Sequence, residues 1–379
     1  MKRLITAAIL AVSLMPLSAI GAGAANALPS NAQRALQWLE CTQQQATGQI
    51  GSGGNTIARS SEVALGLAAA GEPASAMRAG SLSLADYLKT AASNDVGTNG
   101  ELLLARASQP DAGPVAALAA QLQASKSTTG PTAGEYGADI YSDSLAILGL
   151  RAAGQPVTPD AVAFLKSQQK PDGGWSFDNA DAFGTDSNTT AQVIQALLST
   201  DVAAADVSIK NGFSYVKSVF GQGGFGSAPG SGPDANSDEL AIQAILAANQ
   251  QSDAAWGSML NQALAYLAGQ QIVSGTDAGA IANSYSKLFA TTYAPAAFLL
   301  RPLTRTGISE SRVSLLACPL SAAATPTPAA QPTPAPTSQQ PPRLAQTGTP
   351  GGNNEVLLGL ATLILGMGIL RRPARRARR

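Results

Sequence analysis

The order of apolar and polar residues between Phe164 and Leu198 predicts two helices joined by a turn, that is, a helical hairpin. A first helix ends on the apolar pair Phe164-Leu165, and a Gly-rich turn then runs to Trp175. A second helix begins near Thr185 behind an Asp or Ser cap and continues on Ala, Val, Ile and Leu. Because a two-helix hairpin cannot bury its own apolar face, we expect neighbours of the same kind.

The same pattern recurs along the chain. A bulky residue followed by an aliphatic one ends five predicted first helices, at Trp38-Leu39, Tyr87-Leu88, Phe164-Leu165, Tyr215-Val216 and Tyr266-Leu267. Gln stands four positions after the aliphatic residue at Gln43, Gln169 and Gln271. Ala/Leu-rich second helices are expected over 62–70, 101–107, 144–153, 191–198, 239–248 and 286–300. The spacing of about 37 to 49 residues predicts six hairpins, and no alternating runs typical of strands interrupt them.

Residues 1–27 have the features of a secretory signal peptide. Lys2 and Arg3 precede an apolar run, and Ala25-Asn26-Ala27 is a small-x-small cleavage site. A retained membrane helix is the alternative, but Pro16 and small residues interrupt the run. We therefore expect an exported protein whose all-α domain covers residues 28–320. Residues 321–343 are rich in Pro, Thr and Ala, which favours a disordered, semi-rigid stalk in extended polyproline geometry.

Residues 344–379 resemble the sorting signal of Gram-positive surface proteins. The pentapeptide Leu-Ala-Gln-Thr-Gly at 344–348 is a variant of the commoner Leu-Pro-x-Thr-Gly, and an apolar run and an Arg-rich tail follow it. The resemblance implies that a sortase cleaves between Thr347 and Gly348 and joins the protein covalently to cell-wall peptidoglycan.

The apolar run in this signal covers residues 356–370 and is expected to form a C-terminal transmembrane helix. About 15 residues is short for a spanning helix, and the arginines would hold the tail on the cytoplasmic side. A transient stop is therefore favoured, and a plain membrane anchor is the alternative. Either way, we expect the domain in the cell wall or on the outer face of the cytoplasmic membrane.

Processing changes the charge of the protein. The segments to be removed contain eight of the 24 basic residues and only Glu355 of the 24 acidic ones. The mature chain then carries 16 basic and 23 acidic residues, a net charge of about minus seven. This balance makes nucleic acid an unsuitable partner.

The chain has two cysteines, Cys41 in the first predicted unit and Cys318 after the last. In an exported protein they are expected to form a disulfide, with two unpaired buried thiols as the alternative. A disulfide requires the two α-carbons to approach within about 7 Å, which a closed ring of six hairpins allows and an open solenoid does not.

The segment from Phe164 to Trp175 resembles the QW repeat of squalene and hopene cyclases. It has an aromatic-aliphatic pair, then Gln169 and Gly173-Gly174-Trp175. Related repeats occur in prenyltransferase β-subunits, complement-like thioester domains and cobalamin carriers. The resemblance covers about 31–303 and implies an (α/α)6 toroid, with six inner helices around a central cavity and six outer ones enclosing them. These relatives do different things on one scaffold, so the resemblance does not fix the activity.

The residues that these relatives use for catalysis are missing. There is no Asp-x-Asp-Asp acid motif and no Cys-Gly-Glu-Gln thioester, and the absence of His removes zinc sites of the prenyltransferase type and Ser-His-Asp chemistry. The acid-rich loop between Asp172 and Asp186 matches no standard calcium loop. We predict no cofactor and no metal, and the sequence leans against an enzyme.

Polar residues gather at the starts of the predicted second helices, where a toroid would bring them to one mouth of the cavity. One cap per helix is enough to satisfy its free N–H groups, so the surplus forms a candidate ligand-binding rim. The candidates are Asp139, Tyr141, Asp143, Asp186, Asn188, Asn236, Asp238, Asn283 and Tyr285.

These observations predict a wall-anchored, non-catalytic toroid that binds a small molecule or surface glycan, with the cobalamin carriers as analogy. Two alternatives stay open. One is a terpene-cyclase-like or carbohydrate-active enzyme that uses paired rim carboxylates, Asp139 or Asp143 with Asp186 or Asp238. The other is a spacer without a small ligand. A pair of carboxyl groups in reach of one another would favour the enzyme.

Overall fold

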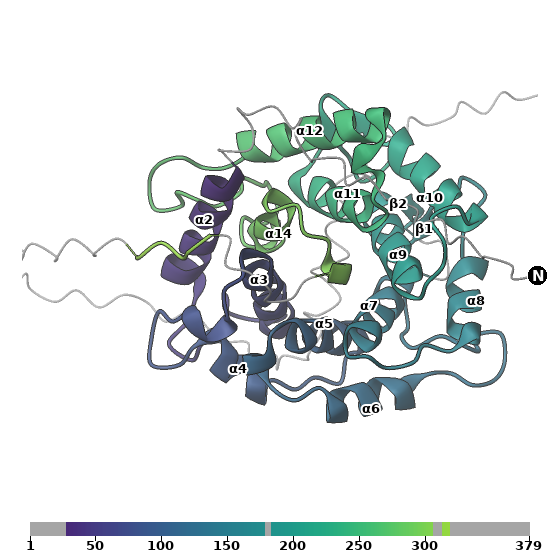
Figure 1. Cartoon of the computed structure of the whole chain (residues 1–379), viewed down its shortest axis with the longest axis horizontal. Coiled ribbons are helices and arrows are strands. Elements are labelled where there is room, and N and C mark those ends of the chain that lie inside the picture. The colour runs from purple at the N-terminus through teal and green to yellow at the C-terminus, as the bar shows by residue number, and fades with distance from the viewer. Residues whose placement is uncertain (1–27, 179–182, 306–312, 319–379) are drawn as a thin grey trace, which may run out of the picture.

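The computed structural model describes residues 28–178, 183–305 and 313–318, which form two concentric rings of helices (Figure 1). This confirms the predicted all-α toroid of six hairpins. The predicted signal peptide, the stalk, the sorting signal and its apolar run lie outside the described residues. Within the described part, no helix is long and apolar enough to span a membrane.

Each hairpin contributes one helix to each ring. The outer helices are α2 (Leu28–Trp38), extended by the π-helix η1 (Leu39–Gln43), α4 (Leu84–Thr90), α6 (Ala116–Ser125), α8 (Pro159–Ser167), α10 (Val207–Ser218) and α12 (Ala254–Gly269). The inner helices are α3 (Thr56–Ala70), α5 (Val96–Ser108), α7 (Ile140–Ala152), α9 (Ser187–Ser199), α11 (Ala235–Ala247) and the pair α13 (Phe289–Thr292) and α14 (Ala294–Phe298). Consecutive inner helices contact one another, and α14 contacts α3 and α11.

The short elements lie in the connections. Two antiparallel two-residue ladders are formed by β1 (Trp175–Ser176) with β2 (Thr185–Asp186), and by β3 (Phe220–Gly221) with β4 (Gly224–Phe225). Single 3-10 turns are η2 (Ala74–Ala76), η3 (Pro110–Ala112), η4 (Gln250–Ser252) and η5 (Leu303–Arg305). The last of them follows α14, contacts α9 and α11, and lies over the interior of the ring in Figure 1.

The sixth inner helix is broken at Tyr293, between α13 and α14, and Pro295 lies in the first turn of α14. Proline has no N–H to donate to the preceding turn, so the helix restarts there. This explains why residues 286–300 show the helical pattern least clearly. The sequence pattern did not reveal the outer helix α6 either, because this helix lacks the bulky-aliphatic pair that marks the other five outer helices.

The apolar faces of the two rings meet in one core. Trp175 is fully buried in it, and its indole N–H donates to the carbonyl of Leu165 at 2.7 Å. The aromatic residue of the QW-like turn therefore packs between helices instead of reaching a ligand.

A Gln side-chain amide joins each marked turn to the next unit. Gln169 Nε2 donates to Gly173 O at 2.7 Å and to Ser208 O of the following outer helix at 2.8 Å. In the first unit Gln44, not the predicted Gln43, makes the corresponding bonds, to Gly48 O and Met77 O. The reason is the π-helix η1, whose wider turn inserts one residue before the Gln.

The ring closes through the same contacts that join its neighbouring units. Gln271 Nε2 donates to Gly279 O within its own turn and to Asn31 O of the first helix, each at 2.9 Å. Gly279 has φ +100°, and a Cβ there would lie 2.2 Å from Arg34 O. Gly48 stands in the same relation to Ser83 O in the first unit. The first and last units are therefore neighbours in a repeating series.

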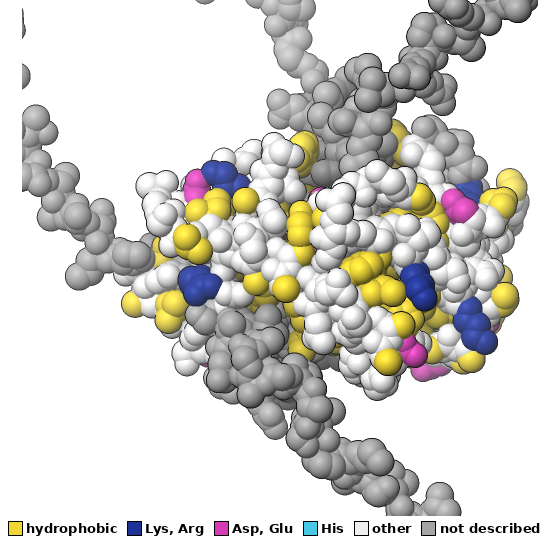
Figure 2. Space-filling model, turned by 90° about the horizontal axis from the view of Figure 1, so that it is seen from above, with side chains coloured by type: hydrophobic (Ala, Val, Ile, Leu, Met, Phe, Trp, Pro, Cys, Tyr) yellow, Lys and Arg dark blue, Asp and Glu magenta, His cyan; other side chains and the backbone are white. Residues whose placement is uncertain are grey.

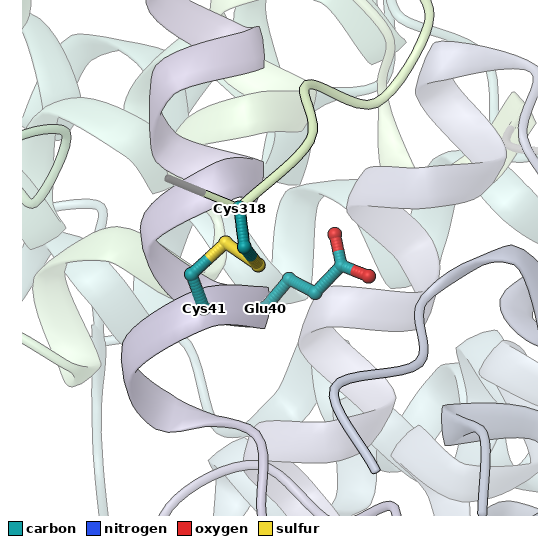
Figure 3. Close-up of side chains that lie close together, drawn as sticks. All are labelled: Glu40, Cys41 and Cys318. Carbon is teal, nitrogen blue, oxygen red and sulfur yellow. A yellow bond between two sulfur atoms is a disulfide. The ribbon is translucent and has the colours of Figure 1, made fainter. Parts of the chain in front are cut away.

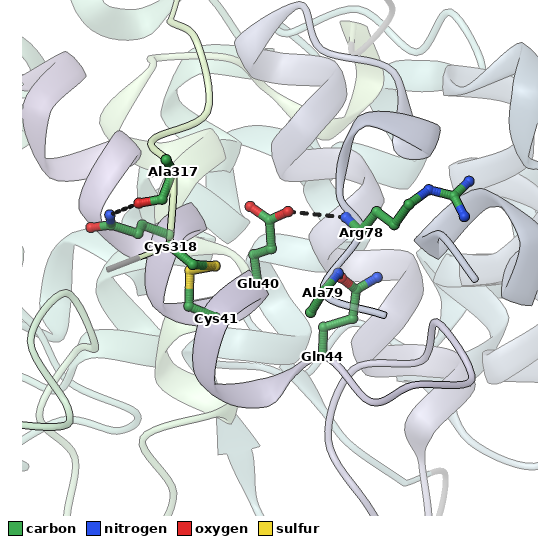
Figure 4. The surroundings of a disulfide bond; sticks show 8 residues. Glu40, Cys41, Gln44, Arg78, Ala79, Ala317 and Cys318 are labelled. Carbon is green, nitrogen blue, oxygen red and sulfur yellow. Dashed lines mark hydrogen bonds between the residues drawn. A yellow bond between two sulfur atoms is a disulfide. The ribbon is translucent and has the colours of Figure 1, made fainter. Parts of the chain in front are cut away.

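A disulfide joins Cys41 to Cys318, as predicted, with the α-carbons 5.4 Å apart (Figure 3). Glu40 lies beside the two sulfurs, but sulfurs bonded to each other cannot serve as thiolate metal ligands. One Glu40 oxygen accepts a hydrogen bond from Arg78 N at 3.0 Å (Figure 4). The group is therefore a structural clasp between the first unit and the end of the described chain.

Candidate functional site

On the side shown in Figure 2, the charged side chains drawn in colour form no single large patch. Charged side chains are scattered there among hydrophobic and uncharged polar ones. The interior of the ring differs, because several charged and amide side chains on the inner helices are buried.

A recurring hydrogen bond fixes how each inner helix is rotated. In five units the bulky residue of the turn donates its backbone N–H to a side chain of the following inner helix. These bonds join Ile50 to Ser60 (3.0 Å), Tyr136 to Asp143 (2.5 Å), Trp175 to Thr190 (2.9 Å), Phe225 to Asp238 (2.6 Å) and Ile281 to Thr291 (2.9 Å). We call the five acceptors the anchor residues. They mark the helix face that points away from the ring axis.

The residue two positions after an anchor points into the ring. Each residue of an α-helix is rotated by about 100° from the one before, so two positions give nearly the opposite face. These lining residues are Glu62, Leu145, Gln192, Leu240 and Tyr293. The sixth lining residue is found by position. In α7 the anchor Asp143 lies four residues after the cap Asp139, and in α5 Asn99 lies four residues after the cap Asp95. Two residues after Asn99 is Glu101, which is therefore the sixth lining residue.

Hydrogen bonds between inner elements bring three of these side chains, Glu62, Glu101 and Tyr293, into one group. Tyr293 OH donates to Glu101 on α5, although α3 lies between them in the order of the ring. Thr292 Oγ1 donates to Glu62 on α3, and Arg59 forms an ion pair with the same carboxylate. The Arg59 guanidinium also lies over the Phe289 ring, 4.3 Å from its centroid.

Glu239 on α11 completes the group. It is fully buried, and neither of its carboxylate oxygens has a hydrogen-bond partner within the described residues. The amides of Gln192 and Gln243 also lack partners there at both the oxygen and the nitrogen. We call Arg59, Glu62, Glu101, Tyr141, Glu239 and Tyr293 the axial cluster.

Burial and mutual repulsion set the protonation of the axial cluster. Burial raises the pKa of Glu101 well above its usual value, and the neighbouring Glu62 raises it further. Burial, with Glu62 again as the next cause, likewise raises the pKa of Glu239. Burial also raises the pKa of Glu62, but the Arg59 guanidinium opposes this shift. Glu62 is thus the carboxylate that the cluster can hold ionised, while Glu101 and Glu239 favour the acid form.

The structure gives most of the predicted rim aspartates structural partners. Asp139 and Asp186 cap α7 and α9 by accepting from Ser142 N and Thr189 N, each at 2.7 Å. Asp143 and Asp238 are anchor residues. Their proposed contact with a ligand stays a prediction.

The remaining rim candidates are Tyr141, Asn188, Asn236, Asn283 and Tyr285. Tyr141 belongs to the axial cluster, and burial raises its pKa, with Glu101 as the next cause. Asn188 and Asn236 stand two residues before an anchor, which is also the inward face. Asn283 donates to Asn236 at 3.4 Å and caps the turn at Tyr285, whose side chain is 45% exposed. The structure therefore brings Asn236 and Asn283 together.

Sequence reasoning missed Arg59, Glu62, Glu101, Glu239 and Tyr293. Four of them lie inside Ala- and Leu-rich helices whose two faces are both covered, so apolar periodicity does not separate the inner face from the outer one, and Tyr293 lies at the break between α13 and α14. Counting two residues onward from each anchor would have found Glu62 and Tyr293.

Comparisons with known proteins show similarity in fold alone. The structure resembles a polysaccharide lyase, with a TM-score of 0.45, 10% identity, and coverage of 73% of this chain and 96% of that chain. It also resembles the type II terpene cyclase MstE from Scytonema, solved with the product merosterolic acid A and with the substrate geranylgeranyl dihydroxybenzoate. The TM-scores are 0.37 and 0.34, the identities 16% and 15%, and the alignments cover 73% of this chain and 79% and 78% of the cyclase chains. No protein-family model and no curated protein matches the sequence.

Proposed function

We propose that this protein is displayed on the cell wall and that its toroid encloses a small polar ligand at the axial cluster. The observation that carries the proposal is that the side chains of Glu239, Gln192 and Gln243 inside the ring have no hydrogen-bond partner among the residues that the structure describes. Buried polar groups in proteins are nearly always hydrogen-bonded, and each one left without a partner costs about 1–3 kcal/mol. A polar ligand that supplies these bonds would remove that cost.

The display on the wall rests on other features. Residues 1–27 have the composition of a signal peptide, and residues 344–379 have that of a sorting signal. The disulfide between Cys41 and Cys318 suits an oxidising location outside the cytoplasm.

Both parts can be tested on protein from its own host. Mature protein released by enzymatic digestion of the wall, and not by detergent, supports covalent anchoring, and its mass should correspond to a chain ending at Thr347 plus the wall fragment joined to its carboxyl group. Native mass spectrometry of this material should show an added mass that disappears on denaturation. An apo mass throughout, together with no change after Glu239→Gln, would count against a ligand at the axial cluster.

A second candidate function is acid–base catalysis at the same place. Glu62 and Glu101 influence one another inside the ring, Arg59 favours the ionised form of Glu62, and Glu101 favours the acid form. Two carboxyl groups with separated protonation states are the usual arrangement for proton transfer to and from a substrate. This pair replaces the rim aspartates considered from the sequence.

The two candidates differ in what Glu101→Gln does. The Gln oxygen can still accept from Tyr293 OH, so a binding protein should keep most of its affinity. An enzyme should instead lose turnover of the co-purified compound by at least about 100-fold, the usual size of a general acid–base contribution. Mass spectrometry of the compound after incubation with each protein measures this difference.

A further inference from the structure

The axial cluster contains more negative than positive groups. Three carboxyl groups, those of Glu62, Glu101 and Glu239, face a single guanidinium. Arg59 is already engaged, because it pairs with Glu62 and stacks on Phe289. Glu101 receives the Tyr293 hydroxyl, and Glu239 receives no bond from the described residues. Glu101 and Glu239 therefore lack a cation of their own.

Buried carboxyl groups without a counter-charge are kept neutral by protons. The charged and titratable groups that act on Glu239 are Glu62, Asp238, Asp234 and Arg59. Those that act on Glu101 are Glu62, Tyr293, Arg59 and Asp95. Arg59 is the one cation in these two sets, so a positive charge placed beside Glu239 would meet little opposition.

We propose that the ligand of the axial cluster carries a primary ammonium group, which binds at Glu239. This inference rests on the proposed binding function and specifies its ligand class. An ammonium has three N–H donors, which match the two Glu239 oxygens and the side-chain oxygen of Gln243 one helical turn further along α11, an oxygen that accepts no hydrogen bond from the described part of the chain. Charge-assisted bonds of this kind are about twice as strong as neutral ones.

The aromatic rings of the site fit the same ligand class. Phe289 already holds one cation, Arg59, over its face. Tyr141 and Tyr293 lie in the same buried group, and aromatic faces attract cations in sites without water. A neutral polyol could also pair with the carboxyl and amide groups, but it would leave the excess of carboxyl groups unbalanced.

The test compares amines with neutral molecules of nearly the same shape. Mature protein is melted with 20 mM glucosamine or glucose, and with 20 mM ethanolamine or ethylene glycol, at constant pH and ionic strength. We expect the amine of at least one pair to raise Tm by 2 °C or more, and its neutral partner to leave Tm unchanged. Titration calorimetry in buffers of different ionisation enthalpy should show about one proton released per amine bound, because the ammonium replaces a proton at the carboxyl group.

Matched variants identify the group responsible. Glu239→Gln keeps the size of the side chain, relieves a buried acid, and should weaken amine binding at least tenfold. Asp201→Asn makes the matching change from carboxyl to amide at an 89% exposed side chain and should leave binding unchanged.

Each outcome decides a different point. Equal Tm shifts with glucose and glucosamine, abolished by Glu239→Gln, would overturn the ammonium inference and leave the binding function in place. Amine shifts that survive Glu239→Gln would place the cation elsewhere and overturn the assignment to Glu239. No shift with either amine would also overturn it, and if the protein from its host carries no added mass, the binding function falls as well.

Discussion

Asp238 should make the stability of the toroid depend on pH. The residue is fully buried, one oxygen accepts from Phe225 N at 2.6 Å, and the other has no partner within the described residues. Burial raises the pKa of its carboxyl group to about 9, whereas an Asp in an unfolded chain titrates near 3.9. Between these values the folded protein holds a proton that the unfolded chain has released. Stability is therefore greatest below about pH 4 for this group and falls as the pH rises toward 9.

The size of the effect follows from the linkage of protons to folding. One proton held only by the folded state costs about 1.4 kcal/mol of unfolding free energy for each pH unit. From pH 5 to pH 8 the loss due to Asp238 amounts to about 4 kcal/mol.

Asp238→Thr tests this reasoning with an anchor that the ring already uses. Thr190 and Thr291 accept the corresponding N–H bonds at 2.9 Å without a titratable group. Urea unfolding followed by circular dichroism at 222 nm gives the unfolding free energy at each pH. The advantage of the variant over the wild type should grow by about 4 kcal/mol between pH 5 and pH 8. Asp201→Asn, at an exposed carboxylate, should follow the wild type. Parallel profiles for Asp238→Thr and the wild type would show that Asp238 is ionised in the folded protein.

Three further changes test the construction of the ring. Gly279→Ala places a Cβ against Arg34 O at a residue with φ +100°, and urea unfolding should show a loss of about 2–4 kcal/mol of unfolding free energy. The control is Gly269→Ala, whose Cβ would meet nothing within 4 Å and which should cost less than about 1 kcal/mol. Gln44→Ala should destabilise the protein by about 2–3 kcal/mol because buried Gly48 and Met77 carbonyls lose their donor, and equal losses from Gln43→Ala would refute the one-residue shift at the π-helix. Replacing both Cys41 and Cys318 by Ser removes the disulfide between residues 277 positions apart and should lower the unfolding free energy by about 2–5 kcal/mol. An unchanged melting temperature would mean that the disulfide does not stabilise the fold.

The architecture was predictable because its signals are local. A bulky-aliphatic pair, a Gly at positive φ and a cap recur in the sequence, and each corresponds to one physical requirement of a helical hairpin. The exceptions have physical causes as well. The outer helix α6 has no such pair, and η1 displaces the functional Gln by one position.

The candidate site was not predictable in the same way. Polar residues at helix starts were expected to form the rim, and their contact with a ligand stays a prediction. In the structure Asp139 and Asp186 act as caps, and Asp143 and Asp238 hold the preceding turns. The axial cluster depends on the rotation of each inner helix, which those anchor bonds fix. Glu239 follows Asp238 by one residue, so helix geometry turns the two side chains about 100° apart, and the anchor bond of Asp238 fixes the rotation of α11 in the ring.

The clasp between Cys41 and Cys318 also determines how the domain would bear mechanical load. With the wall link proposed at Thr347, tension from flow or from a held partner would enter the folded part at its carboxyl end. Without the disulfide, that pull would peel away the final segment, which is held at Gln33 and Gln37 by single hydrogen bonds to Ser314 and Ala317, and then reach the broken sixth inner helix. With the disulfide, the force passes through a covalent bond into the first outer helix. The load would then act on the closed ring as a whole, and the chain would not unfold step by step from its carboxyl end.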